Sequence, residues 1–359
     1  MLSQAGIVGN MTRIIDRRSS TTQPYLMTKS TDAMTISSPV TRSILCVFIA
    51  LCSYTPAQAQ NYPLKPVRIV LPYPAGGSSD AIVRAISQKL SAALGQPIVI
   101  DNRAGAGGSV GTENVARSQP DGYTLLIGTS GTHGINPSLY ARLPYDPVKD
   151  FSPISLVTLG MNVLVVHPSV PAKSTRELIT LAKSRPGKLN FSSASNGATS
   201  HLAGEMLKML AGINIVHVPF KGAEPAITSL ISGEVDLAIL NIPALLPQIR
   251  ANKLRALAVA STKRSSSLPD LPTLIETGLA DFDASSWNGL FAPAATPRDV
   301  VARLNTEVTR IVRLPDVVAL LSSYGTEPAG NTAEQFEAFV KSEISRWAKV
   351  VKASGARVD

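Results

Sequence analysis

The spacing of hydrophobic residues along the chain alternates between two periods and predicts an α/β fold. Residues 67–71 form a short β-branched run typical of a strand, and residues 81–94 carry apolar side chains at the spacing of an amphipathic helix. The same succession of strand and helix continues to about residue 260, which indicates mostly parallel sheets flanked by helices. Further strands are expected at 97–102, 123–128, 154–159, 163–166, 188–194, 215–220, 235–240 and 255–260.

The last part of the chain has a different pattern. Residues 287–291 predict one more strand, and three helical segments follow at about 298–313, 315–322 and 333–352, with no further strand expected. Helices without a sheet of their own should fold back on the first part of the chain.

The turn at residues 75–80 connects the first strand to the first helix. Gly76 and Gly77 can adopt positive φ and let a ligand approach the main chain, while the serines and the aspartate that follow can cap the helix. Free N–H groups at the positive end of a helix suit an anion. The alternative is a tight connection that only caps its helix.

A second stretch repeats this chemistry. The strand at 188–194 runs into a small polar loop and then into a helix that starts near His201, with hydroxyl groups gathered at the helix start. These hydroxyls belong to Ser192, Ser193, Ser195, Thr199 and Ser200. The alternative is again a serine-rich loop that caps its helix.

Several common kinds of site are disfavoured by the sequence. The glycine-rich stretch 103–111 reads G-x-G-G-x-x-G and lacks an acidic residue about twenty positions later, so a close helix–sheet contact is favoured over dinucleotide binding. The formal charge is +9, but the basic residues are scattered and aromatic residues make up only 5%, which disfavours nucleic-acid binding. The four histidines are isolated from one another, so we expect no metal and no cofactor.

The start of the chain looks like a secretory signal. Arg42 precedes an apolar run at 44–52 that is too short to span a bilayer, and Ala57-Gln58-Ala59 supplies the small residues that precede a cleavage site. The expected mature protein therefore begins at Gln60 in the periplasm. A lipoprotein signal with Cys52 is the alternative, although Leu51 stands where a small residue is usual.

The two cysteines also lie in this segment, at Cys46 and Cys52, so the body of the protein has no thiol nucleophile and no disulfide. Because Met34 would open a signal of normal length, translation from Met34 is an alternative start. Residues 1–59 are thus predicted to be an N-terminal extension and signal peptide.

A secreted serine hydrolase is the rival from another functional class. It would use Ser130 or Ser195 with His133 or His201. The nucleophile elbow requires glycine two residues on either side of the serine, and around Ser130 only Gly128 fits, since Thr132 holds the other position. We therefore expect no catalytic residues.

A series of motifs spans residues 62–359 and resembles the Bug (TctC-like) family, the extracytoplasmic solute receptors of tripartite tricarboxylate transporters. Each motif alone is unremarkable, and their order is specific. They are YPAGGSSD (73–80), NRAGAGGSVG (102–111), PDGYTLLIGTSGTHGINPSLY (120–140), LPYDPVKDFSPI (143–154), HLAGEM (201–206), VPFKGAEPAI (218–227), LPDLPTLIETGL (268–279), WNGLFAPAATP (287–297) and ISRWAKVVKASG (344–355).

The resemblance implies a two-lobed type II periplasmic binding protein fold, with residues 60–160 and 286–359 in lobe one and residues 161–285 in lobe two. A ligand carboxylate would sit on the turn at 75–80 and the loop around 193–199 would hold its far end. The candidate ligand-binding residues are Tyr73, Ala75, Gly76, Gly77, Ser79, Asp80, Thr129, Ser130, Ser193, Ser195, Gly197, Ala198, Thr199 and Asn241.

The implied function is a non-enzymatic, monomeric receptor that hands a small carboxylate to the membrane subunits of such a transporter; delivery to a sensor kinase is the alternative. Two departures from the family pattern concern the ligand. Ser192 and Ser195 replace glycines that are usual in the second loop, and Leu240 stands where an acidic residue often precedes Asn241. The missing carboxylate disfavours ligands with an ammonium group.

Overall fold

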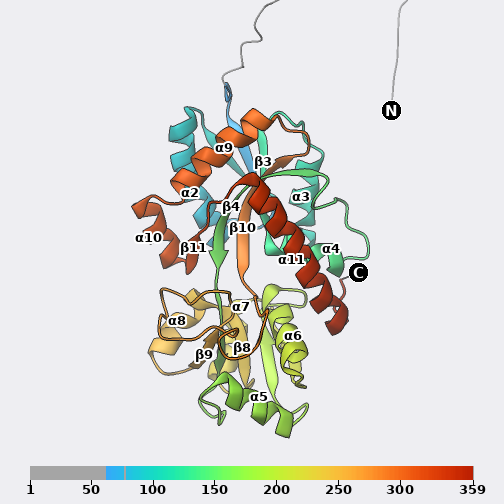
Figure 1. The fold of residues 1–359 in the computed structure, drawn as a ribbon, viewed down its shortest axis with the longest axis vertical. Helices are drawn as coiled ribbons and strands as arrows, with labels where there is room; N and C mark the ends of the chain where they lie inside the picture. The colour runs from blue at the N-terminus through green and yellow to red at the C-terminus, as the bar shows by residue number, and fades with distance from the viewer. Residues whose placement is uncertain (1–61, 77, 359) are drawn as a thin grey trace, which may run out of the picture. The chain divides into compact units, whose positions relative to one another are not determined.

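The computed structural model describes residues 62–76 and 78–358. They form an α/β fold with two β-sheets covered by helices (Figure 1). The predicted signal peptide, both cysteines and Gly77 lie outside the described residues. No helix within the described residues is long and apolar enough to cross a membrane.

The six-stranded sheet has the strand order β11-β4-β10-β3-β1-β2. Its strands are β1 (Val67–Leu71), β2 (Ile98–Asn102), β3 (Thr124–Thr129), β4 (Phe151–Gly160), β10 (Ser286–Pro293) and β11 (Thr326–Pro328). β1 pairs in parallel with β2 and β3, whereas β10 runs antiparallel to both β3 and β4. The strands β1 to β4 therefore all point in one direction, and β10 and β11 return against them.

The five-stranded sheet has the order β7-β6-β8-β5-β9. Its strands are β5 (Asn162–Val166), β6 (Asn190–Ser193), β7 (Val216–Pro219), β8 (Leu237–Asn241) and β9 (Arg255–Val259). Only β5 opposes the common direction, because it pairs antiparallel with β8 and β9 while β6 pairs in parallel with β7 and β8. The predicted α/β fold is thus confirmed, and both sheets are mixed, with most strands of each pointing in one direction.

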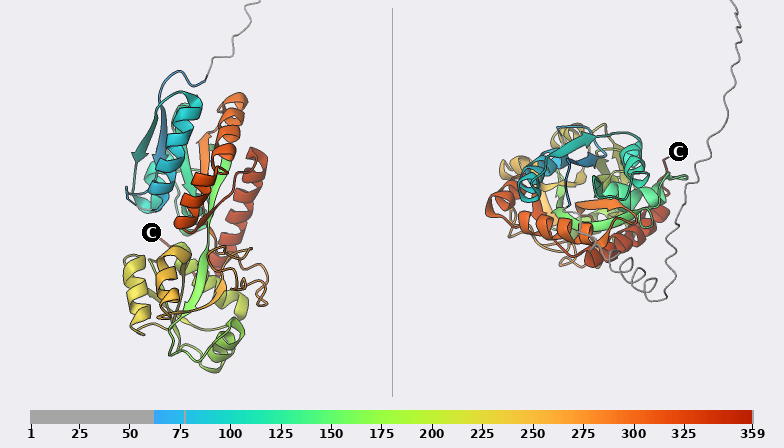
Figure 2. Two further views of the ribbon diagram at one scale, coloured as in Figure 1. Left: turned by 90° about the vertical axis from the view of Figure 1, so that its left-hand side faces the viewer. Right: turned by 90° about the horizontal axis from the view of Figure 1, so that it is seen from above.

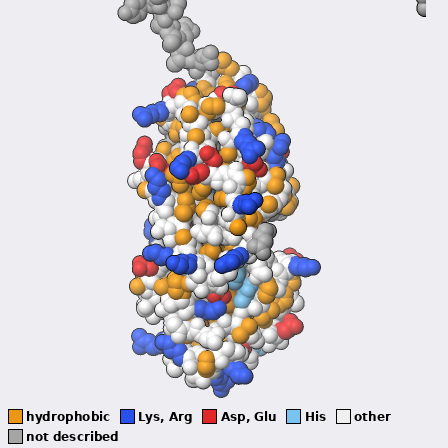
Figure 3. Space-filling view, turned by 90° about the vertical axis from the view of Figure 1, so that its right-hand side faces the viewer, with side chains coloured by type: hydrophobic (Ala, Val, Ile, Leu, Met, Phe, Trp, Pro, Cys, Tyr) orange, Lys and Arg blue, Asp and Glu red, His pale blue; other side chains and the backbone are white. Residues whose placement is uncertain are grey.

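The helices lie on the faces of the two sheets (Figures 1 and 2). Their bounds are α2 (Ser78–Leu94), α3 (Ser109–Ala116), α4 (Asn136–Leu139), α5 (Thr175–Ser184), α6 (Thr199–Ala211), α7 (Ala223–Ile231), α8 (Ile242–Arg250), α9 (Arg298–Ile311), α10 (Pro315–Ser323) and α11 (Ala333–Ser354). On the six-stranded sheet, Leu90 of α2, Leu125 of β3 and Leu304 of α9 are fully buried in one core. Lys and Arg side chains are spread among acidic and apolar ones over the face in Figure 3.

The last helix covers both sheets rather than the first part of the chain alone. Phe336 of α11 packs in the core around Trp287 of β10, whereas Trp347 and Val350 belong to the core of the five-stranded sheet. The helix has 22 residues, which corresponds to a length of about 33 Å, enough to reach along both sheets. In Figure 1 it runs diagonally from the six-stranded sheet past α4 toward α6.

Two short elements differ from the sequence-based expectation. β11 is a strand that the sequence did not predict, since three residues at the edge of a sheet carry no recognisable period. The segment after β3 is a π-helical turn, η2 (Ser130–Ile135), that leads directly into α4.

The glycine-rich stretch forms a short 3₁₀ turn, η1 (Ala106–Gly108), followed by α3. A Cβ on Gly111 would lie 2.7 Å from the Arg103 carbonyl oxygen and 3.0 Å from Pro72 Cα. The predicted close approach of a helix to the sheet is therefore confirmed.

Candidate functional site

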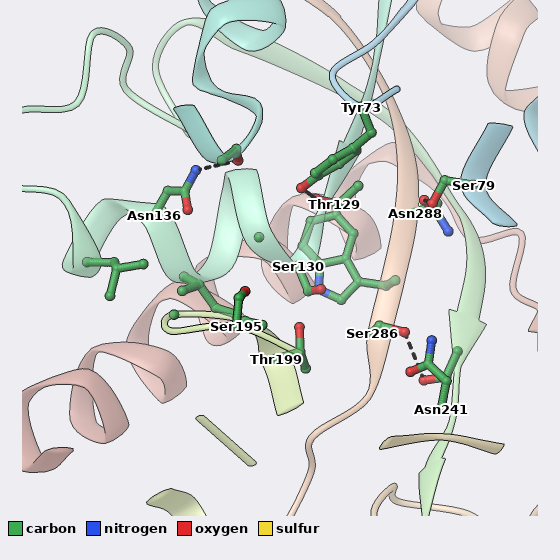
Figure 4. Close-up of a pocket in the computed structure, with 18 of the residues that line it drawn as sticks. Tyr73, Ser79, Thr129, Ser130, Asn136, Ser195, Thr199, Asn241, Ser286 and Asn288 are labelled. Carbon is green, nitrogen blue, oxygen red and sulfur yellow. Dashed lines mark hydrogen bonds between the residues drawn. The ribbon is translucent and has the colours of Figure 1, made fainter. Parts of the chain in front are cut away.

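A pocket of about 410 Å³ lies between the two sheets, and its wall takes residues from both (Figure 4). Nine of the fourteen predicted ligand-binding residues line it: Tyr73, Ser79, Thr129, Ser130, Ser195, Gly197, Ala198, Thr199 and Asn241. Four do not, namely Ala75, Gly76, Asp80 and Ser193. The fourteenth is Gly77, which is not described.

The chemistry of this wall is uncharged. Among the described residues that line the pocket there is no Lys, Arg, Asp, Glu or His. The polar groups are hydroxyls, side-chain amides and main-chain groups, and the apolar side includes Ile82, Ile135, Leu139 and Trp287. A cavity of this size fits a small molecule.

One side of the wall is built where β1 and β3 end. The hydroxyl oxygen of Tyr73 lies 2.9 Å from Thr129 Oγ1, so the turns after the two strands lie beside each other, as the parallel pairing of β1 and β3 predicts. Thr129 also starts η2, because the Thr132 N–H donates to its hydroxyl and its own N–H donates to Thr132 Oγ1. Burial raises the pKa of Tyr73, so its hydroxyl stays protonated.

The first turn of α2 contacts the strand that crosses between the sheets. Ser79 Oγ donates to Asn288 Oδ1 over 3.0 Å, and Asn288 Nδ2 donates to Thr158 Oγ1 over 3.0 Å. This chain of bonds links α2, β10 and β4 at the pocket wall.

The Asp80 carboxylate bonds within the turn after β1 and does not line the pocket. Gly76 has φ +90°, as predicted for this turn, but its N–H donates to Asp80 Oδ2 over 3.1 Å and so is already occupied. Arg84 donates to both carboxylate oxygens, at 2.8 and 3.0 Å, and Asn102 Nδ2 donates to Oδ1. These bonds, with that from Arg84 the largest, lower the pKa of Asp80 to about 2. Asp80 therefore stabilises the turn and does not reach the pocket.

The loop after β6 supplies the opposite wall. Ala198 is the N-cap of α6 and has no side-chain acceptor, so no side chain caps this helix. The first N–H groups of α6 thus remain at the pocket edge, where Thr199 lines the wall. Gly197 has φ +73°, and a Cβ there would lie 2.6 Å from Leu139 Cδ2 in α4, so the loop lies directly against the other side of the pocket.

Ser193 lies behind this loop instead of in the wall. Its side chain is fully buried, its hydroxyl donates to the Ser195 carbonyl over 3.1 Å, and its Oγ lies 2.6 Å from His217 Nε2. Asn241 ends β8 and lines the pocket next to α8, while Leu240 before it is buried in the core.

Several lining residues were not predicted as site residues. They come from η1, from α4 and the residue after it, from β10, from the junction of α10 and β11, and from the segment after α11. In chain order they are Gly107, Asn136, Leu139, Tyr140, Ser286, Trp287, Asn288, Tyr324, Gly325, Thr326 and Val358. Trp287 donates from Nε1 to the buried Glu343 over 2.8 Å, which fixes the indole at the wall. Part of this set lies within the motifs at 102–111, 120–140 and 287–297, whereas Ser286, Val358 and residues 324–326 lie outside every motif.

The geometry does not support the hydrolase alternative. His133 is fully buried, its Nδ1 lies 2.9 Å from Thr132 Oγ1, and burial lowers its pKa to about 3. His201 Nδ1 accepts the N–H of Gly197. Neither imidazole is hydrogen-bonded to Ser130 or Ser195 within the described residues. Among residues 62–76 and 78–358 no three His, Cys, Asp or Glu side chains group as metal ligands.

Comparison with known proteins gives a consistent match over most of the chain. Residues 82–356 match the model of the tripartite tricarboxylate transporter family receptor, TctC. Protein BugT of Bordetella pertussis is 37% identical over 318 residues, which cover 88% of this chain and 98% of BugT.

Two solved structures are also similar. The structure of R. palustris Rpa4515 with adipate is 38% identical, with a TM-score of 0.70, covering 82% of this chain and 98% of that one. MatC from Rhodopseudomonas palustris with bound malate is 36% identical, with a TM-score of 0.67, covering 81% and 100%.

These matches confirm the two-lobed periplasmic binding protein fold that the motif series implied. They also confirm that the chain is a receptor and not an enzyme. The resemblance first seen in scattered motifs thus holds along most of the sequence, and the chain belongs to the TctC family of periplasmic receptors for tripartite tricarboxylate transporters.

Proposed function

We propose that the pocket between the two sheets captures a small carboxylate. The observation that carries the proposal is a wall without ionic side chains that ends at the uncapped start of α6. An anion held there is neutralised by main-chain N–H groups, hydroxyls and the helix dipole instead of by an arginine. Two similar structures hold adipate and malate, which makes dicarboxylates the first ligands to try.

The proposed contacts come from both sides of the pocket. Tyr73, Thr129 and Ser130 would hold one end of the ligand, beside Ser79 with its bond to Asn288, and the loop around Ser195 with Asn241 would hold the other. A hydrogen bond to a charged group contributes about 1.5–3 kcal/mol. Three or four of these, less the entropy of association, give roughly micromolar affinity.

The proposed lobes are residues 60–160 with 286–359 and residues 161–285. The chain passes from one sheet to the other at Met161 and returns before Ser286, so the two crossings lie next to each other where Ser286 pairs with Gly160. A ligand that touches both lobes only when they approach each other favours the closed state by that difference in contact.

As a TctC-family receptor the protein serves a tripartite transporter, and we propose that it does so as a monomer that docks on the membrane subunits. We also propose that residues 1–59 are removed, so that the mature chain begins at Gln60. Mass spectrometry of the exported protein tests this start. A lipid-modified Cys52 at the N-terminus would contradict it.

The chain offers its own reporter for ligand binding. Of its two tryptophans, Trp287 lines the pocket and Trp347 is buried in the core. Titration with adipate and with malate should change the Trp287 emission, and a Trp287→Phe variant should lose most of that change. Calorimetry with the same acids supplies the affinity.

The decisive comparison is between a bound acid and its methyl ester. The ester removes the negative charge of the esterified carboxylate and adds one methyl group, so several N–H groups at the start of α6 lose their ionic acceptor. We expect the ester to bind about 2–4 kcal/mol more weakly, the cost of poorly paired buried polar groups. Equal affinity for acid and ester would contradict a carboxylate site.

A further inference from the structure

Two histidines form a stacked pair directly behind the pocket loop. His201 in the first turn of α6 and His217 in β7 have ring centroids 3.8 Å apart and planes 13° apart. Phe191 of β6 continues the stack, with its centroid 4.9 Å from that of His217. Neither imidazole lines the pocket, so the pair acts on the ligand only through the pocket loop that it supports.

Each imidazole is connected to the loop. The Gly197 N–H donates to His201 Nδ1 over 3.1 Å, which anchors the tip of the loop to the helix behind it. Ser193 donates its proton to the Ser195 carbonyl, so the 2.6 Å contact between His217 and Ser193 requires an Nε2–H on the imidazole. The pair therefore supports the loop at its beginning and at its tip.

This arrangement requires the neutral form of His201. A protonated Nδ1 is a donor and cannot accept the Gly197 N–H. The charged neighbours of the pair are Glu205, whose Oε1 lies 3.8 Å from His201 Nε2, and Lys208, which binds Glu205. Burial, outweighing Glu205, lowers the pKa of His201, and burial together with His201 lowers the pKa of His217 to about 4.

We infer that His201 is a positioning residue of the binding site: its neutral imidazole, stacked on His217, holds the Gly197 main chain in the form that lines the pocket. The inference rests on the proposed carboxylate site. Protonation of His201 breaks this bond, releases the loop tip and weakens ligand binding, and because burial lowers the pKa of His201 this loss develops below the ordinary histidine pKa of about 6.5.

Two substitutions separate the acceptor from the ring. In His201→Asn, Oδ1 stands the same number of bonds from Cα as Nδ1, so an acceptor that does not titrate replaces one that does. In His201→Phe the ring and its stack remain and the acceptor is lost. His167→Asn is the matched control, because His167 lies away from the pocket and, among the described residues, its imidazole bonds only to Ser169.

The first readout needs no ligand. The amide proton of Gly197 should exchange slowly with solvent in the wild-type protein at pH 7.5 and about tenfold or more faster in His201→Phe. His201→Asn should keep its protection. Unchanged exchange at Gly197 in His201→Phe would overturn the inference, because the bond to Nδ1 would then hold nothing in place.

The second readout is the affinity for adipate between pH 5 and 8. We expect about a tenfold loss in His201→Phe at pH 7.5 and less than threefold in His201→Asn. Wild type and His167→Asn should lose affinity on acidification more steeply than His201→Asn. Titration of adipate itself affects all three proteins equally, so the difference between the profiles reports on His201. Identical pH profiles in wild type and His201→Asn would overturn the inference.

Failure of the proposed function has a separate signature. If wild type binds neither adipate nor malate, the carboxylate proposal fails, and the exchange of the Gly197 amide still decides whether His201 positions the loop. If His201→Phe does not fold, the exchange and pH profile of His201→Asn remain, and loss of Gly197 protection in that variant at pH 7.5 counts against the bond.

Discussion

The turn after β1 and the loop after β6 look alike in the sequence and differ in the structure. Both lead from a strand through small polar residues into a helix. In the first, Asp80 reaches back and takes the Gly76 N–H, and Arg84 and Asn102 fix the carboxylate. In the second, Ala198 caps nothing, and the imidazole of His201 holds the loop from behind.

The difference shows what makes a helix start available to a ligand. A carboxylate in the first turn of a helix accepts hydrogen bonds from free N–H groups as a bound anion does. In the turn after β1, the Asp80 carboxylate already takes that place. The loop after β6 has hydroxyls and no carboxylate within its first turn, and its N–H groups are left for another acceptor. We therefore expect substitutions in the second loop to affect affinity and those around Asp80 to affect stability.

The largest effect is expected for Gly197→Ala. The new Cβ would stand at positive φ and 2.6 Å from Leu139 Cδ2, so either the Leu139 side chain or the loop must shift where the two meet at the pocket wall. We expect the affinity for adipate to fall at least thirtyfold. Gly76→Ala has positive φ as well but no atom within 4 Å of its Cβ, so it should cost about 1–2 kcal/mol of stability and little affinity.

Gly212→Ala is the control for backbone strain alone. Gly212 ends α6 with φ +60° and has open space around a Cβ, so this variant shares the strain and lies away from the pocket. Affinities measured by calorimetry on variants with comparable melting temperatures decide the matter. A folded Gly197→Ala protein that binds like Gly212→Ala would remove the distinction between the two turns.

The second prediction concerns the approach of the two sides of the pocket at a position outside the loop after β6, and its effect on adipate affinity. Gly325, beside β11, lines the pocket, and its Cβ would lie 2.1 Å from Pro243 Cγ in α8. Because Gly325 belongs to the side of the six-stranded sheet and Pro243 to that of the five-stranded sheet, and the two approach closely, Gly325→Ala should hold the two sides of the pocket apart and weaken adipate binding about tenfold. Its φ of +57° matches that of Gly212. Small-angle scattering with and without adipate should show a smaller change than in wild type.

The sequence predicted the fold better than the site. The hydrophobic periods placed nearly all strands, because most of them bury apolar side chains in a core, and missed β11, whose three residues lie at a sheet edge. Ser195 and Thr199 were found because they lie between a strand and the first turn of the helix that follows it. Trp287 and Val358 were not, since only the crossing strands and the end of α11 bring them to the pocket.

The same limit explains Asp80. Its position in a glycine turn suggests a ligand contact, and nothing local in the sequence shows that Asn102, on β2, would bind its carboxylate. The role of His201 was also hidden, because its partner His217 lies on another strand and the Gly197 bond depends on the bend of the loop.

The third prediction uses pH to separate the supports of the two turns. The pKa of His217 is lowered to about 4, so its contribution to folding is complete above about 6.5 and is lost as the pH falls toward 4. The pKa of Asp80 is lowered to about 2, so its contribution is complete above about 4 and is lost only below that. Hydrogen exchange at pH 5 should therefore show the 194–201 segment opening while the 73–84 segment stays protected. Simultaneous opening of both segments would contradict separate supports.

The smallest effect is expected for single hydroxyls, and it distinguishes the two turns most finely. Ser195 lines the pocket, and no side-chain hydrogen bond of its own is found among the described residues. Ser195→Ala should therefore reduce adipate affinity by about 1 kcal/mol, roughly fivefold, and leave the melting temperature of the ligand-free protein unchanged.

Ser79 instead donates to Asn288, whose amide also binds Thr158, so Ser79→Ala leaves a buried acceptor unpaired. Its cost should appear mainly as about 1 kcal/mol of lost stability before any ligand is added. If Ser79→Ala kept full stability and lost as much affinity as Ser195→Ala, the first turn would bind the ligand through its side chains as the second does, and the bond to Asn288 would be of little consequence.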